Sequence, residues 1–169
     1  GTQVKRRTFL QSGAGAMGAA LSASEIDWPR KAHGAGLHFK YSVCNEVFEK
    51  WDFARTCRAI REAGFEGIEI SPFTLAEHLD QISPARRREL KDIIRSEGLA
   101  FAGLHWLLVT PKGLHVTTSD RETRVRSWDY VRKLVDLCAD LGDGGIMVFG
   151  SPKQRGTQGN TAGEATQNL

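Results

Sequence analysis

Two side chains that can transfer protons stand at the ends of short apolar runs in this sequence. Glu69 lies between Ile68 and Ile70, and His105 ends the run that begins at Phe101. Carboxylates and imidazoles act as general acids and bases, and both also bind metal ions and substrate hydroxyls. The alternatives are a carboxylate paired with a nearby Arg or Lys, and a buried histidine with satisfied hydrogen bonds. We predict that Glu69 and His105 are catalytic residues.

Further polar and aromatic residues stand after apolar runs of the same kind. Trp106 could form a stacking wall for a sugar ring, or pack in the core. Glu46 could enter a pocket from the end of the first run. The loop after the fourth run could bind phosphate or sugar hydroxyls, or be a solvated loop. We predict five substrate-binding residues: Glu46, Trp106, Lys153, Gln154 and Arg155.

The sequence contains no complete metal site. It lacks His-x-x-His and His-Glu-x-x-His spacings, and its three cysteines form no Cys-x-x-Cys pair. The odd number and wide spacing of Cys44, Cys57 and Cys138 also argue against a disulfide framework. We expect all three to be small buried hydrophobic residues. His115, in a long loop, is a weaker functional candidate, and we assign no metal ligand.

Strand and helix signals alternate along residues 39–169. Four short apolar runs read as strands: Phe39–Cys44, Gly67–Ile70, Phe101–His105 and Gly145–Phe149. A helix-like segment follows each run, and four residues suited to cap these helices are Asp52, Ser83, Ser119 and Thr161. This alternation predicts an α/β fold with a parallel sheet. Because ligands bind beyond the carboxyl ends of parallel strands, the candidate residues should lie at one edge.

The predicted architecture is a TIM barrel truncated after about four strands. A complete barrel of this type needs roughly 250 residues, whereas the sequence has 169. We therefore interpret residues 39–169 as the N-terminal half of a barrel. Half a barrel leaves its first and fourth strands as open edges and its interior uncovered. We expect this chain to be inactive by itself and, where it is stable, to self-associate into a homo-oligomer.

The first 38 residues read as a leader and a linker. Two adjacent arginines, Arg6 and Arg7, precede Phe9 and Leu10, and a Gly/Ala-rich stretch follows. This pattern resembles a twin-arginine export signal, although a basic tail or a first helix is the alternative. We predict a signal peptide over residues 1–24, a linker over 25–38 and a periplasmic protein. No apolar run approaches the roughly 18 residues of a transmembrane helix, so we expect no stable membrane anchor.

The positive charge of the chain comes from its first 38 residues. They hold five basic and two acidic side chains, whereas the whole sequence holds 23 and 20. Residues 39–169 therefore carry 18 of each and are neutral. A nucleic-acid-binding domain is expected to carry its positive charge on the folded part, so we expect no nucleic-acid partner.

Three segments in this order resemble the xylose-isomerase-like TIM-barrel superfamily, and more narrowly its sugar phosphate isomerase/epimerase branch. They are Gly-Ile-Glu ending at Glu69, Gly-Leu-His-Trp ending at Trp106, and Val-Phe-Gly-Ser-Pro-Lys-Gln-Arg ending at Arg155. The resemblance implies a divalent metal (Mn, Mg, Co or Zn) that stabilises an enediolate formed by proton abstraction beside a carbonyl. It also implies that the principal metal carboxylates come from the fifth to eighth strands, outside this sequence.

Three functions are compatible with these residues. The first is a metal-dependent isomerase or epimerase of a sugar or sugar phosphate, in which Glu69 and His105 act on the substrate. The second is a non-catalytic sugar-binding barrel that lacks the metal site. The third is an enzyme like the related endonuclease that cuts DNA at abasic sites, where His105 could be a metal ligand. The neutral folded part and the export signal argue against the third, so we expect a sugar as the partner.

Overall fold

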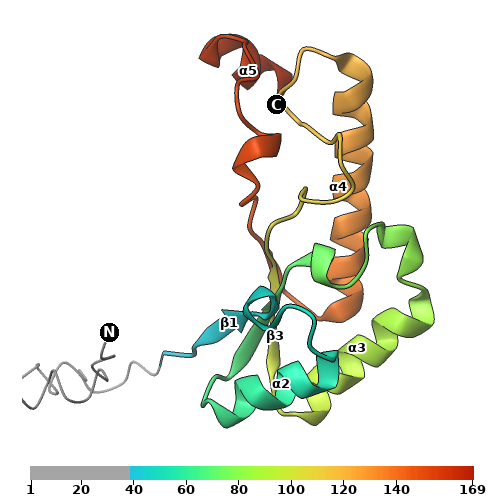
Figure 1. Cartoon of the computed structure of the whole chain (residues 1–169), viewed down its shortest axis with the longest axis vertical. Helices are drawn as coiled ribbons and strands as arrows, with labels where there is room; N and C mark the ends of the chain where they lie inside the picture. Colours follow the sequence, from blue (N-terminus) through green and yellow to red (C-terminus); the bar gives the residue numbers. More distant parts are fainter. Residues whose placement is uncertain (1–38) are drawn as a thin grey trace, which may run out of the picture. The chain divides into compact units, whose positions relative to one another are not determined.

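The computed structural model describes residues 39–169, which form a four-stranded parallel sheet (Figure 1). The strands are β1 (Ser42–Cys44), β2 (Gly67–Ile70), β3 (Ala100–Leu104) and β4 (Ile146–Met147), and each lies beside the next one in sequence. A sequential order without reversal is that of a barrel rather than a doubly wound sheet. The predicted parallel α/β fold is therefore confirmed. The predicted signal peptide and linker lie outside the described residues.

Helices connect the strands and extend the chain beyond β4. The α-helices are α2 (Phe53–Glu62), α3 (Pro84–Ser96), α4 (Arg121–Leu141) and α5 (Ala162–Asn168). Short 3-10 helices follow the strands at η1 (Asn45–Phe48), η2 (Pro72–Thr74) and η4 (Pro152–Gln154), and η3 (Leu79–Gln81) precedes α3. Of the helices in residues 39–169, none combines the length and the hydropathy that a bilayer crossing requires.

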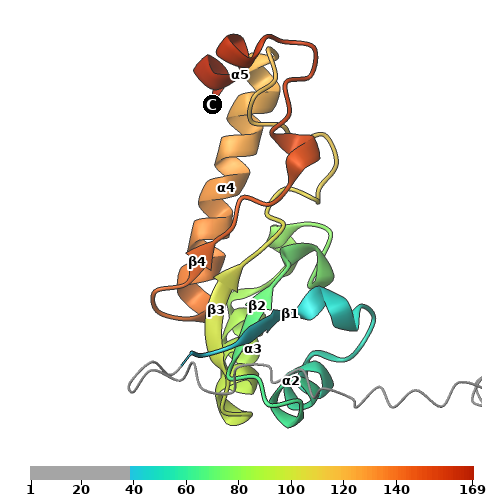
Figure 2. The ribbon, with the colours of Figure 1, turned by 90° about the vertical axis from the view of Figure 1, so that its left-hand side faces the viewer.

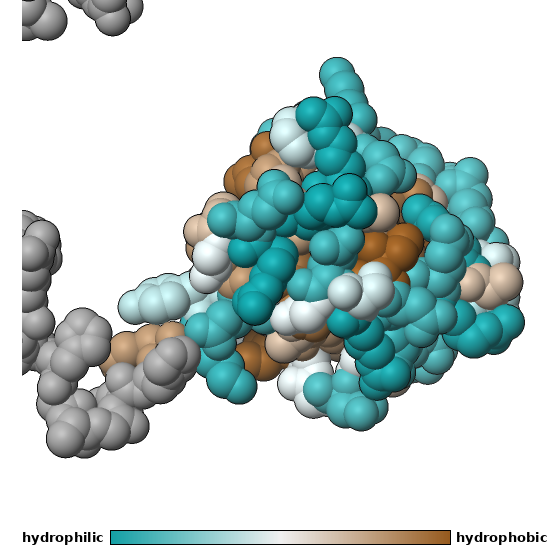
Figure 3. Space-filling view, turned by 90° about the horizontal axis from the view of Figure 1, so that it is seen from below, coloured by the Kyte–Doolittle hydropathy of each residue, from teal (hydrophilic) through white to brown (hydrophobic). Residues whose placement is uncertain are grey.

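One hydrophobic core lies between the sheet and helices α2, α3 and α4 (Figure 2). Ile68 and Ile70 of β2 are fully buried, as are Ile60, Leu90 and Leu134 of the three helices. The outward faces of the helices carry charged residues, and the end of the molecule in Figure 3 is mainly hydrophilic with smaller apolar areas. Burial of these apolar helix faces holds the strands in register.

The outer strands are shorter than the sequence predicts. The predicted runs Phe39–Cys44 and Gly145–Phe149 contribute only three and two residues to the ladder. Within the described sheet, β1 and β4 each pair with a single neighbour, which leaves the other side of each strand without backbone partners. Ile146 of β4 is 70% exposed on this open sheet.

A β-bulge interrupts the pairing of β2 with β3. Ile68 lies opposite Phe101, but the next residue, Glu69, lies opposite Gly103, so Ala102 is unpaired. A one-residue slip moves every later side chain of a strand to the other face. Beyond the bulge, Leu104 is fully buried against the helices. Its neighbours Gly103 and His105 therefore lie on the opposite face of the sheet, which we call the interior face.

The start of α4 differs by one residue from the prediction. Asp120, not Ser119, is the N-cap, and its side chain accepts a hydrogen bond from the Thr123 backbone N–H at 3.0 Å. The Ser119 carbonyl instead accepts from the Arg124 guanidinium at 2.8 Å. The hydrogen bonds from Thr123 hold the pKa of the Asp120 carboxyl below its usual range. The other three predicted caps, Asp52, Ser83 and Thr161, are confirmed.

We predict that Asp120→Ala lowers the denaturant midpoint of the chain, because it removes the N-cap of α4. Ser119→Ala is the matched control and should leave the midpoint unchanged. The cap contributes stability above the unfolded carboxyl pKa of about 3.9 and loses it as pH falls through the lower folded value. The Asp120→Ala variant should therefore lose less stability than the parent chain on acidification. Equal midpoints for the two variants at neutral pH would contradict the assignment.

Candidate functional site

The register of the sheet brings polar side chains of three strands together at its carboxyl edge. Cys44 is paired with Glu69, and Glu69 with Gly103. His105 stands two residues after Gly103, so it lies on the face of the sheet that Glu69 occupies. We call the group formed by Cys44, Glu46, Glu69, Ser71, His105 and Trp106 the strand-end cluster.

The catalytic candidates Glu69 and His105 lie beside each other in the strand-end cluster. The Glu69 Oε2 atom is 3.7 Å from His105 Nδ1, which exceeds a hydrogen-bond distance. The two side chains are 33% and 28% exposed, so a small molecule can reach them. The Nδ1 atom itself is buried and has no hydrogen-bond partner among the described residues. Its hydrogen-bonding capacity is therefore unused among the described residues.

Gly150 allows the loop after β4 to approach the His105 ring. A Cβ atom at position 150 would lie 3.3 Å from His105 Nε2, which is closer than most real contacts of this kind. The loop therefore packs directly against the imidazole. His105 also makes an edge contact with the Trp106 ring, with centroids 5.5 Å apart. These two contacts fix the position of the ring.

The Glu46 carboxylate joins the ends of β1, β2 and β3 by hydrogen bonds. Its Oε2 accepts from the Ser71 hydroxyl at 3.2 Å, and its Oε1 accepts from the Trp106 indole N–H at 3.2 Å. Asn45 adds a second link, because its Oδ1 accepts from the Ser71 backbone N–H at 2.9 Å. Both Glu46 oxygens are thus engaged, which favours a role in holding the edge of the cluster.

Trp106 has a strained backbone. Its φ of +54° lies in the left-handed region, where residues other than glycine are uncommon. Such a conformation costs on the order of 1–3 kcal/mol and persists where surrounding contacts impose it. Here the hydrogen bond to Glu46 and the contact with His105 supply those constraints.

Cys44 belongs to the strand-end cluster, a position that we did not predict. Cys57 and Cys138 are buried as predicted, whereas Cys44 is only partly buried, and all three are free. The Cys44 Sγ atom lies 3.1 Å from the Ser71 hydroxyl. Burial raises the pKa of the Cys44 thiol. Because the Ser71 hydroxyl donates its hydrogen to Glu46, it can accept from the Cys44 thiol. The contact depends on the register between β1 and β2, which residue spacing does not encode.

Four other candidates make their contacts elsewhere. Lys153 and Arg155 are exposed, and Arg155 lines a separate pocket, while the Gln154 carbonyl accepts from a backbone N–H at 2.9 Å. No hydrogen bond or ion pair within residues 39–169 joins these three to the strand-end cluster. His115 is 3% exposed, its Nδ1 accepts from the Thr117 backbone N–H, and burial lowers its pKa. Its contacts therefore indicate a structural role.

The described residues do not by themselves form a metal site. Residues 39–169 contain no group of three or more His, Cys, Asp or Glu side chains arranged to hold an ion. Glu69 and the unpartnered Nδ1 of His105 supply at most two ligands, fewer than catalytic zinc or magnesium sites use. We therefore derive no chemical step through a metal from this geometry.

Comparison with known proteins gives a matching family model and matching solved structures. A family model described as a xylose isomerase-like TIM barrel matches residues 57–169. No curated protein matches the chain. A crystal structure of D-psicose 3-epimerase in the presence of D-fructose matches with a TM-score of 0.48 and 18% identity. That match covers 61% of this chain and 34% of the other, so this chain spans about a third of its length.

We predict that Trp106→Phe lowers the free energy of unfolding by about 1 kcal/mol, because Glu46 Oε1 loses its donor. Trp51→Phe is the control, since the Trp51 indole N–H has no hydrogen bond among the described residues. Its effect should stay within about 0.5 kcal/mol. Urea unfolding of both variants measures the difference. Equal losses would show that the bond between Trp106 and Glu46 does not stabilise the cluster.

Proposed function

Because the chain belongs to the family of xylose isomerase-like TIM barrels, we propose that the protein is a sugar isomerase or epimerase. The reaction is a proton transfer at the carbon beside a carbonyl group. The single observation that carries this proposal is the pairing of Glu69 with His105, 3.7 Å apart on the interior face of the sheet. A carboxylate and an imidazole at this separation can act on neighbouring atoms of one bound sugar.

We assign the two residues complementary roles. The Glu69 carboxylate takes the proton from the carbon beside the carbonyl, and His105 exchanges a proton with the oxygen on the neighbouring carbon. Because Oε2 and Nδ1 are only 3.7 Å apart, a substrate oxygen that contacts both must lie beside the pair rather than between the two atoms. Trp106 bounds the site next to His105, and Glu46 holds Trp106 in place through the indole N–H.

Metal dependence is part of the proposal. A divalent ion would polarise the carbonyl and stabilise the negative charge that develops on its oxygen. Glu69 and His105 are the described residues that could approach such an ion, and its remaining ligands must come from other residues. We also propose export through the twin-arginine pathway, which rests on Arg6 and Arg7 in the leader.

The second candidate function is a non-catalytic sugar-binding barrel. It is favoured by the finding that residues 39–169 contain no group of three or more His, Cys, Asp or Glu side chains arranged to hold a metal ion. Sugar binding without proton exchange distinguishes this candidate from the enzyme.

We predict that the protein, in its longest natural form and with Mn²⁺, incorporates deuterium from D₂O beside the carbonyl of a ketose or an aldose. NMR spectra of a panel of such sugars measure the exchange. Glu69→Gln and His105→Gln should each slow it by about a hundredfold or more, because each removes a proton-transfer group. Glu62→Gln, on the exposed face of α2, should leave the rate unchanged.

Two results would contradict the proposal. Exchange at the parent rate in both variants would remove Glu69 and His105 from the reaction. Saturable binding of a sugar without any exchange would favour the non-catalytic barrel. Circular dichroism of each variant checks that the fold is retained.

A further inference from the structure

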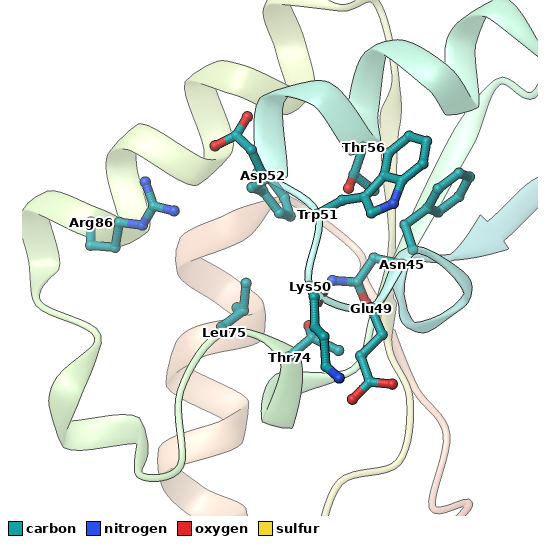
Figure 4. Close-up of a pocket in the computed structure, with 11 residues that line it drawn as sticks. Asn45, Glu49, Lys50, Trp51, Asp52, Thr56, Thr74, Leu75 and Arg86 are labelled. Atoms are coloured by element: carbon teal, nitrogen blue, oxygen red, sulfur yellow. Dashed lines mark hydrogen bonds between the residues drawn. The ribbon is translucent and has the colours of Figure 1, made fainter.

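A second pocket lies between the loop that follows β1 and the loop that follows β2 (Figure 4). We call it the loop pocket, and its volume is about 240 Å³. Asn45 lines the loop pocket, whereas its neighbour Glu46 belongs to the strand-end cluster. The other lining residues come from η1, η2, the segments that directly follow these two, and the first turns of α2 and α3. They are Phe48, Glu49, Lys50, Trp51, Asp52, Phe53, Thr56, Thr74, Leu75 and Arg86.

The base and the rim of the loop pocket differ in character. The buried residues at its base are uncharged, and they include Asn45, Phe53 and Thr56, which are 5%, 8% and 3% exposed. The charged residues lie toward solvent. They are two acids and two bases: Glu49, Asp52, Lys50 and Arg86. The two positive and two negative charges cancel, so the rim favours neither anions nor cations.

Two side chains at the base of the loop pocket keep hydrogen-bonding capacity that no other described residue uses. The Thr56 residue is 3% exposed and lines the pocket, and its hydroxyl makes no hydrogen bond to another residue within 39–169. Asn45 donates one amide hydrogen to Thr74 Oγ1 at 2.7 Å, which leaves its second amide hydrogen free within the described part of the chain. Figure 4 shows the Asn45 nitrogen directed into the pocket. Both groups line the pocket and keep unused hydrogen-bonding capacity, so a polar molecule in the pocket can pair with both.

We propose that the loop pocket binds one uncharged, hydroxyl-rich ring, such as a single sugar unit. A ligand hydroxyl both donates and accepts, so it can pair with the Thr56 hydroxyl and with the free amide hydrogen of Asn45. Phe53 and Leu75 offer apolar surface to the carbon atoms of the ring. The volume is below that of pockets for drug-sized ligands, which suits one ring rather than a longer chain.

This proposal does not depend on the proposed isomerase activity. It uses none of the residues of the strand-end cluster and involves no chemical step. The two sites meet at η1, where Asn45 and Glu46 face different surroundings, and at Ser71, which hydrogen-bonds to Asn45 and Thr74 of the loop pocket. A ligand in the loop pocket would therefore be a second bound group beside the reacting sugar.

The test is a titration of the ¹⁵N-labelled full chain with D-glucose, followed through its amide resonances. We expect saturable shifts at Asn45, Thr56 and Leu75, with a dissociation constant of about millimolar for so small a ligand. D-gluconate and D-glucosamine are charged probes of similar size and should bind more weakly. Tighter binding of either, or no saturable shift at these residues, would overturn the proposal. Shifts confined to Glu69 and His105 would also overturn it while supporting the proposed function.

Thr56→Val tests the hydroxyl itself, because valine has the same shape. It should weaken glucose binding about fivefold, the loss expected for one hydrogen bond. The variant should unfold within a few degrees of the parent chain, since the hydroxyl pairs with no other described residue. Thr166→Val is the control, because the Thr166 hydroxyl donates to the Ala162 carbonyl on α5 and lies outside the pocket. Unchanged affinity in Thr56→Val would show that the hydroxyl pairs with water alone.

Discussion

The β-bulge at Ala102 is the constraint on which the arrangement of the candidate site depends. Phe101 and Leu104 both pack on the helix side of the sheet. They are three positions apart, and a regular strand would place them on opposite faces. Leaving Ala102 unpaired resolves this conflict. The same slip turns His105 to the interior face, where Glu69 already lies. The bulge that lets Phe101 and Leu104 both pack in the core therefore also places His105 on the face that carries Glu69.

Gly103 makes this bulge compatible with the next strand. Its φ of +146° is readily adopted only by glycine, and a Cβ there would lie 1.8 Å from the Ile146 carbonyl oxygen. β4 can therefore pair closely with β3 directly after the bulge. At the carboxyl edge of the sheet, Glu46 follows β1, and its carboxylate hydrogen-bonds to Ser71 after β2 and to Trp106 after β3. Backbone geometry and one carboxylate together hold the edge of the sheet that presents Glu69 and His105.

Much of the fold follows from the sequence, because local signals specify it. The N-cap at Ser83 and the capping box of Thr161 with Glu164 each satisfy backbone groups within a few residues, and both appear as predicted. Ser119 and Asp120 are both good caps, so spacing alone does not choose between them. The rule that parallel strands end at one edge predicts the shared edge of Glu69 and His105, whereas their shared face depends on the bulge.

Features that depend on contacts between strands were not predictable from residue types. An apolar run such as Phe101–Leu104 reads the same with or without a bulge. The contact of Cys44 with Ser71 and the loop pocket around Thr56 require the register and the loop path. For the same reason, the conformation of the loop holding Lys153 and Arg155 does not follow from its place after β4.

The most direct test of this account is the nuclear Overhauser effect between the His105 ring protons and the Glu69 side chain. The bulged register predicts clear cross-peaks between these two groups, because Oε2 and Nδ1 are 3.7 Å apart. It also predicts contacts of Leu104, not of His105, with the buried residues of α4. Cross-peaks from the His105 ring to that helix, with none to Glu69, would contradict the shared interior face and with it the candidate site.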